Sequence, residues 1–113
     1  MRLEAKKYLY DVQQAEALIA DFTEGKVFDD YERDALLRSA VERQFEIIGE
    51  ALAQLARLDD ALAARVTEYQ RIIAFRNILI HGYADVDNRV VWDVVESKLP
   101  RLHLEVEELL AEA

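Results

Sequence analysis

Apolar residues at alternating spacings of four and three constrain the fold of this chain more than any other feature. Between positions 3 and 24 they occur at Tyr8, Val12, Ala15, Ile19 and Phe22. Because an α-helix turns once every ~3.6 residues, this spacing places the apolar side chains on one helix face. The 113 residues include three Gly and one Pro, so few positions favour turns. The pattern therefore predicts an all-α fold built from long amphipathic helices.

Helix-end residues divide the first half of the chain. We expect a first helix over residues 3–24, followed by Gly25, a residue that readily adopts the left-handed conformation of a helix end. Asp29 or Asp30 is expected to cap a second helix over residues 31–56. This second helix carries two apolar stripes, which is typical of a helix at an interface. Gly49 in its middle has no side chain and would permit a neighbouring helix to approach closely.

The second half of the chain divides in the same way. Asp59 or Asp60 is expected to cap a short segment over residues 61–66. Thr67, with Gln70 three residues later, predicts a capping box at the start of a helix over residues 68–81, and Gly82 is expected to end that helix.

Four Val residues and Trp92 between positions 90 and 95 allow two interpretations. β-Branched residues favour strands. We expect a helix instead, because the Val spacings of one, three and one match a helix face and no second strand is present to pair with it. Pro100 suits the first turn of a last helix, with Leu102, Val106 and Leu109 facing inward. His103 on that helix is interpreted as a surface or core-edge residue without a role.

Composition limits the classes of function. A length of 113 residues predicts one domain over residues 1–113, and the absence of Cys excludes disulfides and thiolate chemistry. With no secretory signal and no long apolar run, we expect a cytoplasmic protein without a membrane segment. The net charge of −9 argues against a broad nucleic-acid-binding surface. Any RNA site would need a local positive potential, from residues such as Arg43, Arg71 and Arg76.

Arg76 and His81 are the strongest polar groups in an otherwise apolar helix end. Arg76 shares its helix face with apolar residues three and four positions away: Ile72, Ile73, Leu79 and Ile80. A guanidinium there stays charged and needs a carboxylate or phosphate partner. Glu50 or Glu46 could be that partner, although both could instead belong to a solvated acidic face.

The spacing of the two residues separates them on an ideal helix. Positions five apart diverge by roughly 140°, so Arg76 and His81 do not share a face, whereas Asn77 and His81 do. For Arg76 and His81 to serve one site, either the long Arg side chain curls round the helix or two copies of the helix meet.

The run Arg76-Asn77…His81-Gly82-Tyr83 resembles the Arg-x4-His-x-Tyr motif of the HepT-like toxins, within the HEPN superfamily. The segments 46–51 and 91–100 are also similar to segments of HepT-like chains, so the resemblance covers roughly residues 3–110. It implies an up-down bundle of four to five helices that dimerises through the motif-bearing helix and the second helix.

His and Arg together suit phosphodiester chemistry. A neutral His can remove the proton of a ribose 2′-hydroxyl, and an imidazolium can return a proton to the 5′-oxygen. Arg clamps the phosphate and stabilises the transition state. This predicts metal-independent RNA cleavage without a cofactor, with Arg76 and His81 as catalytic residues and Asn77 and Glu50 as supporting residues. A symmetric dimer would supply two His residues to one cleft.

The resemblance also implies a partner. HepT-like toxins pair with a minimal nucleotidyltransferase antitoxin, MntA, which silences them by attaching AMP to the motif tyrosine, here Tyr83. Further assembly of dimers with the antitoxin is left open. Two alternatives remain: a non-catalytic helical subunit that presents substrate to a nucleotidyltransferase, and a structural dimer in which Arg76 and His81 form a buried polar network.

Overall fold

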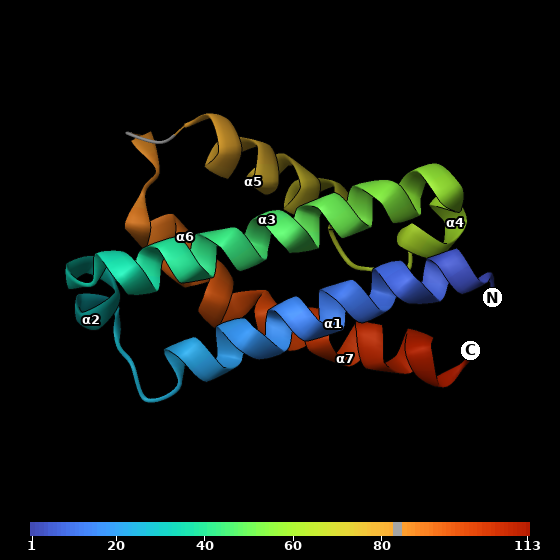
Figure 1. The fold of residues 1–113 in the computed structure, drawn as a ribbon, viewed down its shortest axis with the longest axis horizontal. Coiled ribbons are helices and arrows are strands. Elements are labelled where there is room, and N and C mark those ends of the chain that lie inside the picture. Colours follow the sequence, from blue (N-terminus) through green and yellow to red (C-terminus); the bar gives the residue numbers. More distant parts are fainter. Residues whose placement is uncertain (83–84) are drawn as a thin grey trace.

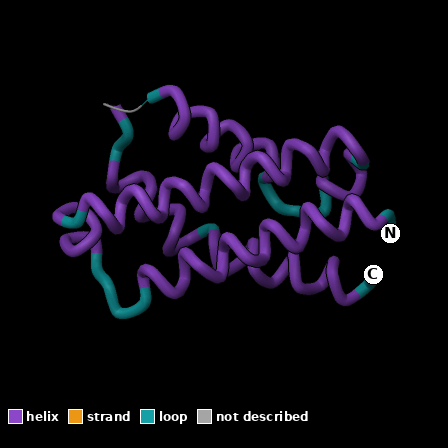
Figure 2. Tube along the Cα trace, in the orientation of Figure 1, coloured by secondary structure: helices purple, strands orange, loops and turns teal. Residues whose placement is uncertain are grey.

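The computed structural model describes residues 1–82 and 85–113, which form seven α-helices and no strand (Figures 1 and 2). These are α1 (Leu3–Thr23), α2 (Phe28–Arg33), α3 (Ala35–Leu58), α4 (Asp60–Ala63), α5 (Tyr69–His81), α6 (Asn88–Ser97) and α7 (Leu99–Ala111). The predicted all-α class is confirmed. The number exceeds the four or five helices expected, because the turns before α3 and after it each contain a short helix.

Helix α3 is the centre of the arrangement. It packs along α1 on one side and along α5 on the other, and α7 lies against α1 (Figure 1). The core therefore lies between α1, α3 and α7, with Leu9, Val12, Ile19, Val41, Ile48, Leu52, Leu55, Val106 and Leu109 buried in it. Because α5 has α3 as its main neighbour, Leu79 is its one fully buried residue among those described.

The prediction of one helix over residues 31–56 is wrong. Helix α2 ends at Arg33, and Asp34 begins α3 by accepting hydrogen bonds from the backbone N–H groups of Leu36 and Leu37, each at 3.1 Å. A short carboxylate competes well for these N–H groups, so it starts a new helix here. Asp30 accepts a hydrogen bond from the N–H of Val27 at 2.9 Å, from inside α2 rather than as its N-cap.

The start of α5 also differs from the prediction. Thr67 does not cap the helix: its N–H and hydroxyl both donate to the Glu105 carboxylate on α7, at 3.0 and 2.6 Å. Helix α5 begins after Glu68, whose φ of 58° is left-handed. The long-range pair with Glu105 therefore replaces the local capping box with Gln70. The preceding segment is also shorter than the predicted 61–66, although Asp59 caps it as expected.

The remaining helix ends follow the sequence closely. Gly25 has a φ of 72° after α1, as predicted. Gly82 ends α5, but with a φ of −111° rather than a left-handed value, and its N–H donates to the Ile78 carbonyl at 2.8 Å. Residues 88–97 are helical, and Pro100 lies in the first turn of α7, as expected. In the described part of the chain, no helix is long and apolar enough to cross a membrane.

Candidate functional site

Gly49 determines how closely α5 approaches α3. A Cβ atom at this position would overlap the Arg76 Cβ and lie 2.8 Å from the Arg76 Cγ. The same Cβ would lie 3.4 Å from the Ile72 carbonyl oxygen, which is tight for backbone. The predicted close approach at Gly49 is therefore confirmed, and the root of the Arg76 side chain occupies the space that a larger residue would take.

Gly49→Ala should lower the free energy of unfolding by about 1–3 kcal/mol, measured by urea denaturation. Ala has the better helix propensity, by ~1 kcal/mol, but its methyl group displaces Arg76 and with it α5. Ser39→Ala, at an exposed position of the same helix, is the control and should change stability by less than about 0.5 kcal/mol. A more stable Gly49→Ala protein would contradict the close approach.

Arg76 forms an ion pair with Glu50 of α3 through its Nη1 atom. The Arg76 side chain is 16% exposed and Glu50 is 51% exposed, so the guanidinium lies at the edge of the interior with its partner facing water. Its Nε atom is buried and has no hydrogen-bond partner among the described residues. Of the two partners expected, the structure has Glu50, while Glu46 lies 3.5 Å from Arg43.

A pocket of about 370 Å³ opens beside this ion pair. Helix α5 contributes Arg76 and Ile80, and α3 contributes Glu50 and its neighbours along the same face. Helix α1 contributes Lys7 and Asp11, which pair with each other at 3.2 Å. The sequence does not indicate these two residues, because only the packing of α1 on α3 brings them to α5.

His81 lies apart from this pocket. It is the last residue of α5, it is exposed, and it is not among the residues that line the pocket. Asn77, one helical turn earlier, is exposed as well. A single chain thus has Arg76 directed towards α3 and His81 on the outer surface of α5, as the spacing of five predicts. Tyr83, the predicted modification site, lies outside the described residues.

A buried carboxylate elsewhere is held by His103. Glu16 of α1 is 3% exposed and accepts a hydrogen bond from His103 Nδ1 of α7 at 2.6 Å, and His103 Nε2 lies 3.5 Å from Glu107. The hydrogen bond to Glu16 raises the pKa of His103. Burial raises the pKa of Glu16, an effect that His103 partly opposes. His103 is at the core edge as expected, but it also links α7 to α1, a contact that no local sequence pattern indicates.

This pair predicts that stability decreases as the pH rises. A folded-state pKa above the unfolded value of 6.5 means that His103 stabilises the fold below that pH, and that the gain is lost as the pH rises through the raised pKa. The loss should be about 0.5–1 kcal/mol, because the exposed His103 is screened by solvent. His103→Gln should flatten the dependence in urea denaturation above pH 6.5. An equal slope in the wild-type protein and in His103→Gln would contradict a role for His103.

The described residues offer little for binding a metal ion. Among residues 1–82 and 85–113, no three or more His, Asp or Glu side chains group closely enough to hold one. The chemical groups that these residues do offer are a guanidinium paired with an exposed carboxylate, an exposed imidazole and an exposed amide.

The family described as "Ribonuclease HepT-like" has a model that matches residues 12–109 of the chain. The chain belongs to the HepT-like ribonuclease family. The match runs from α1 to α7, so it includes α3 and α5 with the ion pair and His81. The resemblance drawn from the Arg-x4-His-x-Tyr run is therefore confirmed.

Relatives of similar length support the HepT-like assignment. A protein of Thermococcus cleftensis named "Probable ribonuclease HepT" is 35% identical over 109 residues, which cover 96% of this chain and 98% of that protein. A protein of Methanocaldococcus jannaschii named "Putative RNase" is 31% identical over 107 residues, covering 95% and 88% of the two chains. No solved structure matches the chain.

Proposed function

We propose that this protein is a metal-independent endoribonuclease that cuts RNA in a cleft formed by two copies of the chain. The observation that carries the proposal is the position of Arg76 on α5 of a HepT-like chain. It is an Arg at the edge of the interior, beside a pocket and paired with an exposed carboxylate. Relatives named as ribonucleases support RNA as the substrate.

The reaction uses the ribose as its own nucleophile. Neutral His81 removes the proton of the 2′-hydroxyl, and O2′ attacks the adjacent phosphorus as the bond from phosphorus to O5′ breaks. An imidazolium, His81 of the second copy, gives its proton to O5′. The products are a 2′,3′-cyclic phosphate and a free 5′-hydroxyl. Arg76 leaves Glu50 to clamp the phosphate and stabilises its growing negative charge. Asn77, one turn before His81, can orient the imidazole.

The outer face of α5 suits contact with a second copy. Ile73 and Ile80 are half-buried on this face, and Asn77 and His81 beside them are exposed. Helix α3 adds Leu36, which is 80% exposed, from the second apolar stripe. Two α5 helices meeting at this face would bring two His81 residues together, which would supply both the base and the acid of the proposed reaction. Sedimentation that shows a monomer at micromolar concentration would count against this dimer.

The test of the reaction is cleavage of a single-stranded RNA in the presence of EDTA. Cleavage should continue, the products should carry a cyclic phosphate, and a strand with 2′-deoxyribose at the cut site should resist cleavage there. Retention of cleavage at the 2′-deoxy position would exclude attack by the 2′-hydroxyl. The alternative of a non-catalytic subunit is favoured by the occupied guanidinium of Arg76, and it predicts no cleavage by the purified protein under any of these conditions.

The proposed regulation is AMP transfer to Tyr83 by a minimal nucleotidyltransferase antitoxin. The adduct would place about one negative charge and a nucleotide's bulk two residues from His81, and so repel the RNA phosphate. Tyr83→Phe should keep most RNA cleavage, because the hydroxyl has no catalytic role, yet escape silencing. Intact mass after incubation with the antitoxin and ATP measures the transfer. An equal AMP-sized gain on wild type and Tyr83→Phe would remove Tyr83 from the mechanism.

A further inference from the structure

A second hollow lies on the opposite flank of α5, between that helix and α6–α7. Its volume is about 310 Å³. Apolar side chains make up most of its wall, including Phe75 and Ile78 of α5, Val94 of α6 and Leu102 of α7. We call it the α5–α7 groove. Because α5 packs mainly on α3, the apolar wall of this groove is left uncovered by the described residues of the same chain.

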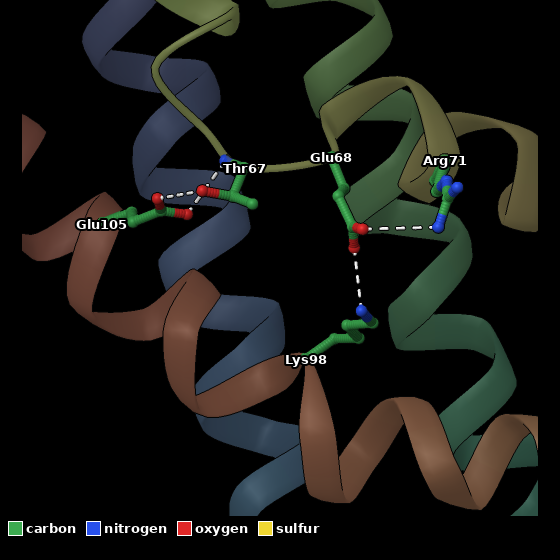
Figure 3. A network of polar contacts seen from close by, with 5 residues as sticks. All are labelled: Thr67, Glu68, Arg71, Lys98 and Glu105. Carbon is green, nitrogen blue, oxygen red and sulfur yellow. Dashed lines mark hydrogen bonds and ion pairs between the residues drawn. The ribbon is translucent and has the colours of Figure 1, made fainter.

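Charged side chains gather at one end of the α5–α7 groove, where α5 begins. Figure 3 shows Glu68 between Arg71 and Lys98, with Thr67 and Glu105 nearby. Lys98 and Arg71 both approach the Glu68 carboxylate, at 2.8 and 3.3 Å. The Glu105 carboxylate accepts hydrogen bonds from the N–H and the hydroxyl of Thr67. Arg101 lines the same end and has no ion pair among the described residues. This end of the groove, its basic rim, thus has three cations and two carboxylates. Both carboxylates already have partners, since Glu68 forms ion pairs and Glu105 accepts hydrogen bonds.

The other two cavities do not share this excess of cations over carboxylates. The pocket beside Arg76 has three cations, Lys7, Arg43 and Arg76, and three carboxylates, Asp11, Glu46 and Glu50. The hollow beside His103 is lined by two carboxylates and that single His. The chain as a whole has a net charge of −9. The α5–α7 groove therefore has the most favourable local potential of the three cavities for an anionic ligand.

The groove also reaches towards the proposed catalytic His81. Ala74 and Ile78 line it, and they precede His81 by seven and three residues on α5. Residues at these spacings lie on the same side of a helix. A strand with its scissile phosphate at His81 could therefore place its next nucleotide at the groove, about one helical turn away.

We propose that the α5–α7 groove binds a nucleobase of the RNA strand being cut, with Arg71 and Arg101 contacting the phosphates beside it. This inference rests on the proposed ribonuclease function. Proteins hold single strands by stacking bases on aromatic and apolar surfaces while cations follow the backbone, and the groove offers Phe75 together with its basic rim. A volume of about 310 Å³ is at the small end of ligand sites, which suits one base better than a docked helix ~10 Å across.

The test measures binding of a short fluorescent single-stranded RNA to the His81→Ala protein, which should not cut it. Arg101→Glu in that background should weaken binding about tenfold more than Arg57→Glu does. It should also reduce the slope of the logarithm of the binding constant against the logarithm of the salt concentration by about one more than Arg57→Glu does. The two substitutions change the net charge equally. Arg57 is exposed and lines none of the three cavities, so it controls for general repulsion.

Val94→Phe tests the apolar wall without a change of charge. A larger side chain in the groove should exclude the base and weaken RNA binding at least about tenfold, with thermal unfolding checking that the fold is intact. Equal binding by Arg101→Glu and Arg57→Glu would overturn the proposal, as would full binding by Val94→Phe. Loss of the dimer by Val94→Phe with RNA binding retained would also overturn it and assign the groove to a second copy.

Failure of this inference is distinguishable from failure of the proposed function. If the wild-type protein cuts RNA while the groove variants bind RNA as their controls do, the nucleobase site is wrong and the ribonuclease assignment stands. If the wild-type protein neither cuts nor binds RNA, the ribonuclease assignment fails and the nucleobase site fails with it.

Discussion

His81→Ala should reduce the rate of RNA cleavage by about 10²–10⁴-fold, because the proposed reaction uses His81 of one copy to take the 2′ proton and His81 of the second copy to protonate O5′. The His81 side chain is exposed at the end of α5 and makes no hydrogen bond or ion pair with the described residues. Its removal should therefore leave the free energy of unfolding within about 0.5 kcal/mol of wild type. The two measurements together separate catalysis from folding.

His103→Ala is the matched control for His81→Ala, since these are the two His residues of the chain. His103 holds the buried Glu16, so its loss should lower stability and leave cleavage nearly unchanged at a temperature where the protein stays folded. The two variants should thus show opposite patterns. Cleavage by His81→Ala at more than about a tenth of the wild-type rate would rule out general acid–base catalysis by His81.

Arg76→Lys should lower kcat for RNA cleavage by about 10²-fold or more, although the charge is kept. A planar guanidinium can donate two parallel hydrogen bonds to a phosphate, whereas an ammonium is a single compact charge. Lys can still pair with Glu50, so the contact between α5 and α3 should survive, and thermal unfolding should confirm this. Near-full cleavage by Arg76→Lys would make Arg76 a structural cation only.

Glu50→Gln complements the Arg76 substitution. It removes the negative charge that pairs with the Arg76 guanidinium while keeping a side chain of similar shape. The Arg76 side chain should therefore be held less firmly, and its charge should be less stabilised at the edge of the interior. If Glu50 supports catalysis by placing Arg76, the variant should raise KM or lower kcat more mildly than Arg76→Lys does. A larger loss in Glu50→Gln than in Arg76→Lys would assign Glu50 a direct part in the reaction.

Mixing wild-type and His81→Ala proteins tests the shared cleft. If one cleft takes His81 from both copies, an excess of His81→Ala protein should suppress cleavage by the wild-type chains after subunit exchange. A mixed dimer has one imidazole, so it lacks either the base or the acid of the proposed reaction. A wild-type rate that stays proportional to the wild-type chains, with exchange shown by mass spectrometry, would mean that each copy supplies its own site.

Much of the fold follows from local sequence, because helix periodicity and end signals act over a few residues. The seam from Tyr8 to Phe22 correctly predicted α1, and Gly25 and Pro100 marked helix ends where the structure has them. The same local reasoning failed where distant groups compete for the backbone. Thr67 reads as an N-cap in sequence, yet it is bound by Glu105, 38 residues away, and so α5 begins elsewhere.

In the candidate site, too, some features follow from local sequence and others depend on how the helices pack. The run from Arg76 to His81 was enough to indicate the family and the kind of chemistry, and helical geometry alone separated those two side chains. The choice of Glu50 over Glu46, the place of Lys7 and Asp11 beside Arg76, and the link from Glu16 to His103 come from helices that pack side by side although they are far apart in sequence. No local pattern contains these contacts, because they depend on the crossing of α1, α3, α5 and α7, which is a property of the packed core.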